Sequence, residues 1–413
     1  MSINVLGESS RVETPFIKVT IGTYTFGVYS QVTSKSTGKI VGIQYPNYVK
    51  SLSVKKINGS VNTYTLKLTY PITESDDPNF FEKVFSSVSD TRKIVFSYGD
   101  LSLPSFIYKD EEALITDVKS TLSASSSTIS YDVTAVSSSA ILTVGNNRFP
   151  AVTDKPSNVI KKLLKNKNYG LQKIFSGMNN ATKLKKIFDD GVIASDDKIV
   201  KLEAKTNISV LDYLTYLVDC MIPLSGKGIY SLVVVDDTSN VYGGTYFRVL
   251  NSTYATTSGS ELGVYSIDIG YPTQKVVTSF SVDDNQAYSI FYNFSNNLVG
   301  SDMVQRINDE GELEYVYAPV ISSATSQRET TASERNWWKK VTEYPISATL
   351  TIKGLLRASM LMTHIRLNVY FYGRKHTSSG LYVITKQVDD ISESGFRTTL
   401  SLTRISNDDT YEF

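Results

Sequence analysis

Apolar and polar residues alternate with a period of two through most of the first third of the chain. Tyr64, Leu66, Leu68 and Tyr70 occupy every second position, and successive side chains of a strand point to opposite faces of a sheet. Asn58-Gly59 separates this segment from an alternating one before it, which is a strong signal for a hairpin turn. Strand patterns resume after residue 92. We therefore predict a β-rich N-terminal region.

One helical pattern interrupts these strands. Phe81, Val84, Phe85 and Val88 have the three- and four-residue spacing of an amphipathic helix, and Asp77-Pro78 can start it.

Helical spacing then dominates the middle of the chain. One helix is predicted to begin at Pro156, and another is predicted to end at Gly191. A third begins at Ser209, with Asp212 three residues on as its capping partner. The segment 228–250 then alternates like a hairpin.

Strand patterns return from residue 263 to the end of the chain. They are interrupted by one predicted helix from Ser333, which carries the adjacent Trp337 and Trp338 and ends before Pro345.

Two hairpin-like segments far apart in the sequence match each other. An ungapped shift of 269 positions places Ile384 on Ile115 and Leu400 on Tyr131, and it keeps the strand phase throughout. Two Ser/Thr-rich hairpins can match by chance, and duplication is the other explanation. Each segment closes a β-rich region that holds one aromatic-bearing helix, which favours two copies of one β module. We predict domains at 1–150 (first β module), 151–255 (α/β insert) and 256–413 (second β module).

This order of β module, helical insert and β module resembles the tail hub, or baseplate hub, proteins of tailed bacteriophages and of contractile injection systems. The segment "GLYVITKQVDDISESGFRTTLSLTRI" resembles the last hairpin of such hubs, and "LTIKGLLRASMLMTHIRLNVYFYG" the strands before it. The segment "NISVLDYLTYLVDCMIPLSGKGIYSLVVVDD" is similar to their helix followed by a hairpin. No appended lysozyme, peptidase or spike repeat accompanies the resemblance.

The resemblance implies a mainly β fold, with two tail-tube-like antiparallel β-barrel or sandwich modules flanking a small helical-plus-hairpin domain. It implies a homotrimer whose six similar barrels match a six-fold tail tube above and a three-fold spike below. The implied partners are the tube ring, the spike and other baseplate or tape-measure proteins, with DNA at most passing through the lumen. The implied location is the tail or baseplate of a virion.

The composition of the chain does not favour nucleic acid or membranes as partners. The 413 residues carry 42 Lys+Arg and 41 Asp+Glu, for a formal charge of +1, whereas chains that bind nucleic acid or membranes over their whole surface are usually lopsided in charge. The start of the sequence lacks a secretory signal pattern, and no apolar run approaches the ~20 residues needed to cross a bilayer. We expect a soluble protein without membrane insertion that is made in the host bacterial cytoplasm.

Candidate catalytic chemistry is sparse. His364, His376 and Cys220 are the only imidazoles and thiol, a poor set for zinc or for a Cys-His or Ser-His pair. Phosphate-loop and dinucleotide-binding glycine motifs are missing from the sequence. Paired carboxylates are expected at helix ends and turns, where aspartate is locally favoured. We therefore expect no enzyme, no cofactor and no metal. The carboxylate pairs are Asp189-Asp190, Asp196-Asp197, Asp236-Asp237, Asp283-Asp284 and Asp389-Asp390.

Two features are candidate partner contacts. The segment 155–188 contains nine lysines, among them Lys161, Lys162 and Lys165, and no acidic residue. They could contact an acidic subunit, DNA or a membrane surface. A solvated helix face is the favoured explanation, because the lysines surround apolar positions that already account for burial. Adjacent residues of a helix point about 100° apart, so one of Trp337 and Trp338 is expected in the core and the other at an interface.

Two other functions stay open at this point. A receptor-binding tail protein or surface adhesin that recognises a host-cell glycan would also suit Ser/Thr/Tyr-rich β domains. A carbohydrate-active enzyme would need one defined carboxylate pair.

Overall fold

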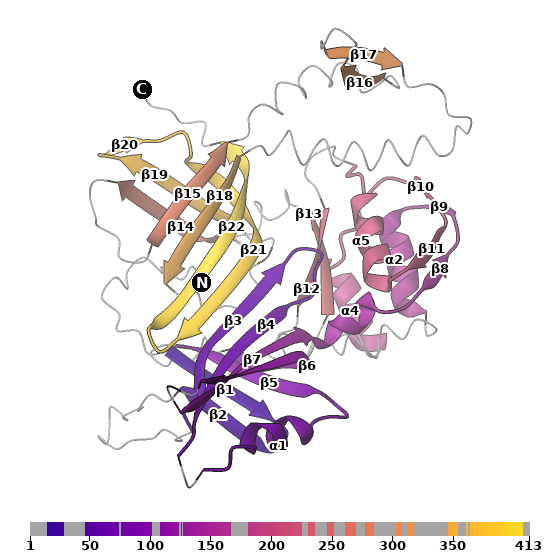
Figure 1. Cartoon of the computed structure of the whole chain (residues 1–413). Coiled ribbons are helices and arrows are strands. Elements are labelled where there is room, and N and C mark those ends of the chain that lie inside the picture. Colours follow the sequence, from indigo (N-terminus) through magenta and orange to yellow (C-terminus); the bar gives the residue numbers. More distant parts are fainter. Residues whose placement is uncertain are drawn as a thin grey trace.

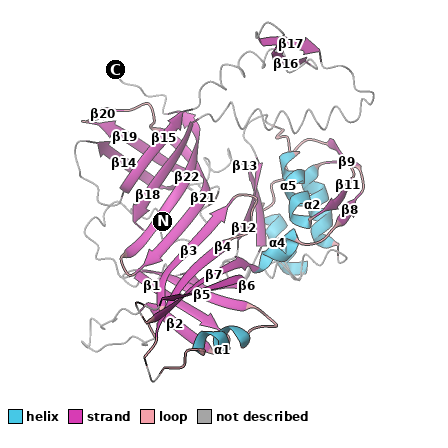
Figure 2. Cartoon of the chain, viewed as in Figure 1, coloured by secondary structure: helices cyan, strands magenta, loops and turns pink. Residues whose placement is uncertain are grey.

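Most of the described strands belong to one large, mainly antiparallel sheet. The computed structural model describes residues 15–28, 46–73, 76–100, 108–123, 125, 127–166, 181–224, 230–235, 246–251, 261–269, 277–284, 303–307, 313–317, 346–353, 361 and 364–407. A 14-stranded sheet connects strands from both ends of the chain, and the helices gather mainly on one side of it (Figure 1, Figure 2). The mainly β fold class predicted from the sequence is confirmed.

The N-terminal strands form one half of this sheet, in the order β3-β4-β7-β6-β5-β1-β2. Asn58-Gly59 turns the chain between β3 and β4 as predicted, and the φ of Gly59 is +71°, a backbone conformation that favours glycine. The predicted aromatic helix is α1, whose Phe81 packs against Phe26 and Tyr131 with ring centroids 5.3 and 4.9 Å apart. The elements are β1 Pro15–Ile21, β2 Tyr24–Val28, β3 Val49–Ile57, β4 Thr63–Pro71, α1 Phe80–Ser86, β5 Lys93–Asp100, β6 Tyr108–Ser123 and β7 Thr128–Ser137.

The middle of the chain forms the predicted insert of helices and short strands. Pro156 begins α2, and Gly191, with φ +66°, follows the end of α4. Ser209 Oγ accepts a hydrogen bond from the Asp212 backbone N–H at 3.0 Å, which caps α5. The elements are η3 Ser138–Thr143, β8 Asn147–Phe149, β9 Val152–Asp154, α2 Pro156–Lys165, α4 Ala181–Asp189, β10 Val200–Leu202, β11 Lys205–Ile208, α5 Val210–Asp219, β12 Tyr230–Val235 and β13 Tyr246–Asn251.

The C-terminal strands form the other half of the sheet, in the order β15-β18-β22-β21, with β19 beside β21 and β14 beside β19. β16 and β17 make a separate hairpin, drawn at the top of Figure 1. The helix predicted from Ser333 lies outside the described residues. The strands are β14 Glu261–Ile269, β15 Val277–Asp284, β16 Met303–Ile307, β17 Leu313–Tyr317, β18 Ile346–Lys353, β19 His364–Phe371, β20 Arg374–Lys375, β21 Gly380–Ser392 and β22 Gly395–Asn407.

The two halves of the sheet share a strand order and an irregularity. The β6–β7 ladder shifts register at Thr116, and the β21–β22 ladder shifts at Thr385. In both, the threonine hydroxyl donates to a carbonyl of the facing strand at 3.1 Å, Thr116 to Thr134 and Thr385 to Ser401. A β-bulge bends its strand at a defined position. Because the bulges lie at matching positions, β6 is equivalent to β21 and β7 is equivalent to β22.

A second pair of bulges extends the correspondence to the neighbouring strands. The β3–β4 ladder shifts between Val49 and Ser51, and the β15–β18 ladder shifts between Val277 and Ser279. Through the shared order, β3, β4 and β5 correspond to β15, β18 and β19. The outermost strands differ, since β1 runs antiparallel to β5 whereas β14 runs parallel to β19.

The ungapped alignment of the two hairpins is correct for their first strands and wrong for their second strands. The turn after β21 is two residues shorter than the turn after β6, so Leu400 corresponds to Val133 and not to Tyr131. A difference of two residues keeps every side chain on the same face of the sheet. The strand phase seen in the sequence was therefore unaffected.

Buried side chains form two cores that cross the predicted segments. The N-terminal strands and α1 share one core with Ile391 and Phe396 of the C-terminal hairpin. The C-terminal strands share the other core with the insert. The boundaries at 150 and 255 stay a prediction. Within the described ranges, no helix has the length and apolarity needed to cross a membrane.

Candidate functional site at the β3–β21 junction

A buried ion pair lies in the N-terminal half of the sheet, next to the strand from the C-terminal half. Lys56 on β3 and Glu111 on β6 are 2% and 1% exposed, and Lys56 Nζ lies 3.2 Å from Glu111 Oε1. Tyr64 and Tyr98 donate their hydroxyls to Glu111 Oε2 at 2.9 and 3.2 Å. Because a buried charge is costly unless it is paired and hydrogen-bonded, these partners account for the presence of Glu111 inside the sheet.

A second carboxylate, Asp389 on β21, is fully buried at this junction. Gln387 Nε2 and Thr398 Oγ1 donate to its two oxygens at 2.7 and 2.6 Å. Burial raises the pKa of the Asp389 carboxyl to about 7; the charge of Lys56 and the two hydrogen bonds lower it, and Glu111 raises it further. Asp389 is therefore within electrostatic range of both Lys56 and Glu111.

These residues meet because β21 pairs with β3, which joins the two halves of the sheet. Gln387 lies opposite Lys56 in the antiparallel ladder, and Asp389 lies opposite Val54. In Figure 1 the yellow β21 runs beside the indigo β3. Slipping this pairing by one residue would turn every buried polar group to the other face. The network therefore favours one register between the two halves.

The β3–β4 turn ties the junction to the insert. The Asn58 backbone N–H donates to the carbonyl of Thr385, the bulge residue of β21, at 3.2 Å. The Gly59 N–H donates to the carbonyl of Leu232 on β12 at 2.7 Å. Two adjacent amides of one hairpin turn thus contact the C-terminal strands and the insert. The junction fixes three parts of the chain relative to one another.

The charged groups of this site are shielded from solvent. No cluster of three or more metal-ligating side chains occurs in the parts of the chain that the structure describes. Buried polar groups of this kind can specify one pairing over its alternatives.

Comparison with solved structures identifies the fold. The 43 kDa tail protein of prophage MuSo2 from Shewanella oneidensis matches with 10% identity and a TM-score of 0.50, over 95% of this chain and 99% of its own. The chain has the fold of a phage tail protein. The resemblance noted from the sequence is confirmed in its fold. No protein-family model and no curated protein sequence matches the chain.

Two further structures are similar to this tail-protein fold. A tail protein from Neisseria meningitidis matches with 9% identity and a TM-score of 0.49, over 95% of this chain and 97% of its own. A component of the Escherichia coli type VI secretion system, itself similar to bacteriophage T4 tail proteins, matches with 12% identity and a TM-score of 0.46, over 89% of this chain and 76% of its own.

The junction residues of this tail-protein fold were missed by the sequence analysis, except as part of an aspartate pair. Asp389-Asp390 was expected at a helix end or turn, and this is wrong because both residues lie inside β21. Asp236-Asp237 lies outside the described residues. Asp197 does not follow the expectation either, because it forms an isolated bridge with Pro223. It is buried and accepts hydrogen bonds from the Ser157 N–H and hydroxyl at 3.0 and 2.6 Å, at the start of α2.

The histidines and the cysteine lie apart from the junction network. His364 is buried in β19, and His376 Nδ1 lies 2.8 Å from Ser378 Oγ in the turn that follows β20. Cys220 is buried at the end of α5, and burial raises the pKa of its thiol to about 11. A thiol that stays protonated at neutral pH is a poor nucleophile.

The three candidate lysines lie on α2, where they contact residues of their own chain. Lys162 Nζ pairs with Asp154 at 2.6 Å, and this bond lowers the pKa of the Asp154 carboxyl. Lys161 and Lys165 place their Nζ atoms 5.7 and 5.5 Å from the centre of the Phe188 ring. These contacts support the interpretation as a solvated helix face, and partner contact stays a prediction. Trp337 and Trp338 lie outside the described residues.

Changing Lys161, Lys162 and Lys165 together to glutamate should leave self-assembly unchanged. The loss of one exposed ion pair and two cation–π contacts should lower the free energy of unfolding by only about 1–2 kcal/mol. Mass photometry would check the assembly, and the triple alanine variant separates lost contacts from new repulsion. A glutamate variant that stays folded but loses self-assembly would show that α2 contacts another subunit.

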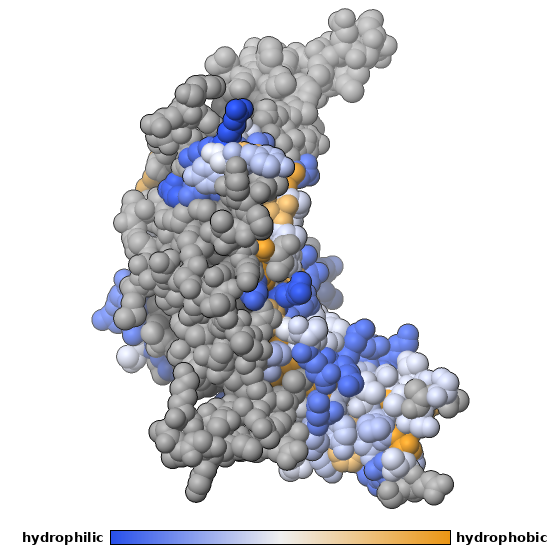
Figure 3. Space-filling view, turned by 90° about the vertical axis from the view of Figure 1, so that its left-hand side faces the viewer, coloured by the Kyte–Doolittle hydropathy of each residue, from blue (hydrophilic) through white to orange (hydrophobic). Residues whose placement is uncertain are grey.

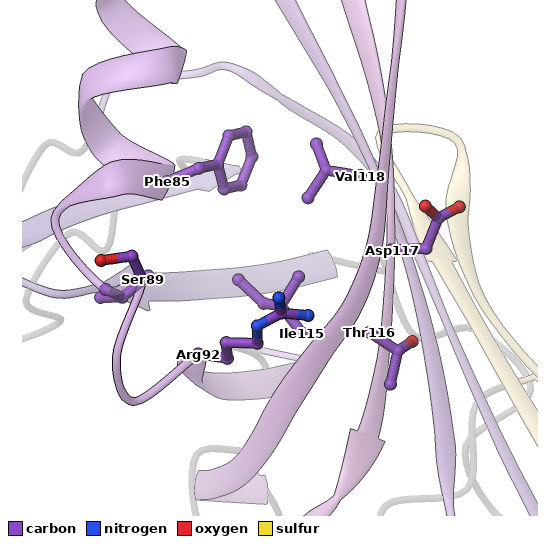
Figure 4. Close-up of a pocket in the computed structure, with 8 residues that line it drawn as sticks. Phe85, Ser89, Arg92, Ile115, Thr116, Asp117 and Val118 are labelled. Atoms are coloured by element: carbon purple, nitrogen blue, oxygen red, sulfur yellow. The ribbon is translucent and has the colours of Figure 1, made fainter.

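A shallow groove of about 330 Å³ opens beside the bulge of β6. Phe85 on α1 and Val118 on β6 face each other across it, with Arg92 and Ile115 at its base (Figure 4). On another face of the molecule, hydrophilic residues predominate among those coloured and hydrophobic ones form only small patches (Figure 3). The groove is too open to enclose a small substrate, since ligand sites bury most of the ligand surface.

Proposed function

We propose that this chain is a non-enzymatic structural component of a phage tail, and that three copies form the hub between a six-fold tail tube and a three-fold spike. The observation that supports this proposal is the repeated sheet. Each chain carries two sets of strands with the same order and with bulges at equivalent positions. Three copies therefore supply six similar units.

The physical reason for a doubled unit is the mismatch of symmetry between a tube and a spike. A six-fold ring needs six equivalent surfaces, whereas a three-fold spike needs three. A cyclic trimer of a doubled chain presents six similar surfaces on one side and three identical ones on the other. The tail-protein fold shared with the Shewanella oneidensis prophage protein is consistent with this role. The proposed partners are further copies of the chain, the tube ring and the spike.

We expect the purified protein to have three times the chain mass of 45.8 kDa in solution, at least at micromolar concentration. Sedimentation velocity followed by averaging of particle images would test for trimers with six similar densities. A protein that stays monomeric at high concentration, and in the presence of tube and spike proteins, would contradict the proposal. Saturable glycan binding by such a monomer would favour the receptor-binding alternative.

A further inference from the structure

Among the strand edges that stay unpaired within the described residues, two belong to the strands that are equivalent to β21 and β3. β6 pairs with β5 only as far as Leu114, so Asp117–Ser123 pairs with β7 on one side and with no described strand on the other. β15 pairs with β18 and ends the sheet order. Unpaired N–H and C=O groups along an edge are a template for another strand.

The same edge is occupied in the other half of the sheet. The part of β21 equivalent to Asp117–Ser123 is Lys386–Ser392, and β3 pairs with it antiparallel. β15 is the strand equivalent to β3, as the matching bulges and neighbours establish. Each chain thus contains one completed junction, which is β21 with β3. It also contains the two equivalent strands, β6 and β15, which are not paired with each other.

We propose that β15 of one copy pairs antiparallel with Asp117–Ser123 of a second copy, in the register of the β21–β3 junction. This inference rests on the proposed function, because it specifies how the copies of the hub contact one another. Because β6 is equivalent to β21 and β15 to β3, the register of the β21–β3 ladder determines which residues of β6 and β15 lie opposite each other. The pairs are Leu122 with Phe280, Thr121 with Ser281, Ser120 with Val282 and Lys119 with Asp283.

The side chains in this register are complementary. Leu122 and Phe280 occupy the positions of Ile391 and Leu52, which are both buried in the completed junction. In the single chain Leu122 is 76% exposed, an exposure that a paired strand would reduce.

The remaining pairs add charge and apolar contact. Lys119 meets Asp283, and both side chains are exposed in the single chain; opposite charges directly across a ladder are favourable. Val282, which is 37% exposed, turns to the same face as Leu122. The groove of Figure 4 lies where this edge begins, since Thr116, Asp117 and Val118 line it.

The contact joins two different surfaces and so runs head to tail. A head-to-tail contact closes into a ring when its rotation divides a full turn, and otherwise makes an open filament. Within each chain the β21–β3 pairing links the two halves of the sheet, and between chains the β6–β15 pairing would repeat that link. Three copies therefore contain three links of each kind, which alternate around the ring. These six similar links are the number that the proposed hub requires.

Cysteine cross-linking tests the register directly, because both side chains of the Thr121–Ser281 pair are exposed in the single chain and the native Cys220 is buried. The variant with Thr121→Cys and Ser281→Cys should form, under mild oxidation, a covalent species of three chains on non-reducing gels. Each single variant alone should stay uncross-linked, since a head-to-tail contact never brings identical residues together. Mixing the two single variants should give a covalent dimer.

The slipped pair Thr121→Cys with Ser279→Cys is the matched control. Its cysteines would lie diagonally across the ladder, where Cα atoms about 7–8 Å apart are too distant for a disulfide. Equal cross-linking of both pairs would overturn the register. A trimer by mass that forms no Thr121–Ser281 cross-link would overturn this contact and leave the proposed hub standing. A monomer at every concentration would overturn both.

Discussion

Replacing Lys56 with methionine should lower the free energy of unfolding by about 3–5 kcal/mol at pH 7, the cost of breaking a buried ion pair. Methionine fills a similar volume but leaves Glu111 with only the hydroxyls of Tyr64 and Tyr98. The carboxyl must then stay charged without a cation or take up a proton. Both outcomes cost free energy.

The pH dependence of this loss separates an electrostatic cause from a packing defect. A buried carboxylate without its cation favours the uncharged form, so the deficit should shrink as pH falls from 7 toward 5. Urea unfolding at several pH values would measure it. A deficit that is constant with pH would point to packing.

Lys93→Met is the matched control on a neighbouring part of the sheet. Lys93 Nζ lies 2.6 Å from Glu112 Oε1, but both side chains are about half exposed. Exposed pairs contribute about 0–1 kcal/mol, so this variant should unfold close to the wild type. A Lys56→Met protein as stable as the Lys93→Met protein would contradict a structural role for the buried pair.

The local parts of the fold could be predicted from the sequence because their signals are local. The Asn58-Gly59 turn, the start of α2 at Pro156 and the Ser209 cap of α5 each depend on residues within a few positions. The pairing of β21 with β3 could not be predicted in this way. It joins residues from opposite ends of the chain, and any alternating strand offers a similar edge.

The buried network left a signal that could have been found. Lys56 continues the inward phase of Leu52 and Val54, and Asp389 continues that of Ile391. A charged residue at an inward position of a strand predicts a buried partner. The identity of the partner depends on the pairing of distant strands. The sequence could therefore have indicated that a buried polar site exists, but not which residues form it.

Asp389→Asn should remove a pH dependence that the wild-type protein carries. The pKa of Asp389 is raised from 3.8 to about 7 in the folded state, so the folded state binds a proton that the unfolded state releases. A group of this sign stabilises the fold fully below pH 3.8 and loses that contribution as pH rises through 7. Between pH 5 and pH 8 the wild-type protein should therefore lose on the order of 2–3 kcal/mol through this group.

The asparagine variant has no such proton and should show a curve of unfolding free energy against pH that is flatter by that amount. Its amide can still accept from Thr398 or Gln387, so its fold should persist. Asp390→Asn is the control, because Asp390 is adjacent but exposed on the opposite face, and its curve should follow the wild type. An Asp389→Asn protein whose curve keeps the wild-type slope would show that Asp389 is already ionised at pH 5. The β21–β3 junction would then hold two carboxylates against one lysine, and its register would depend on strand pairing and packing alone.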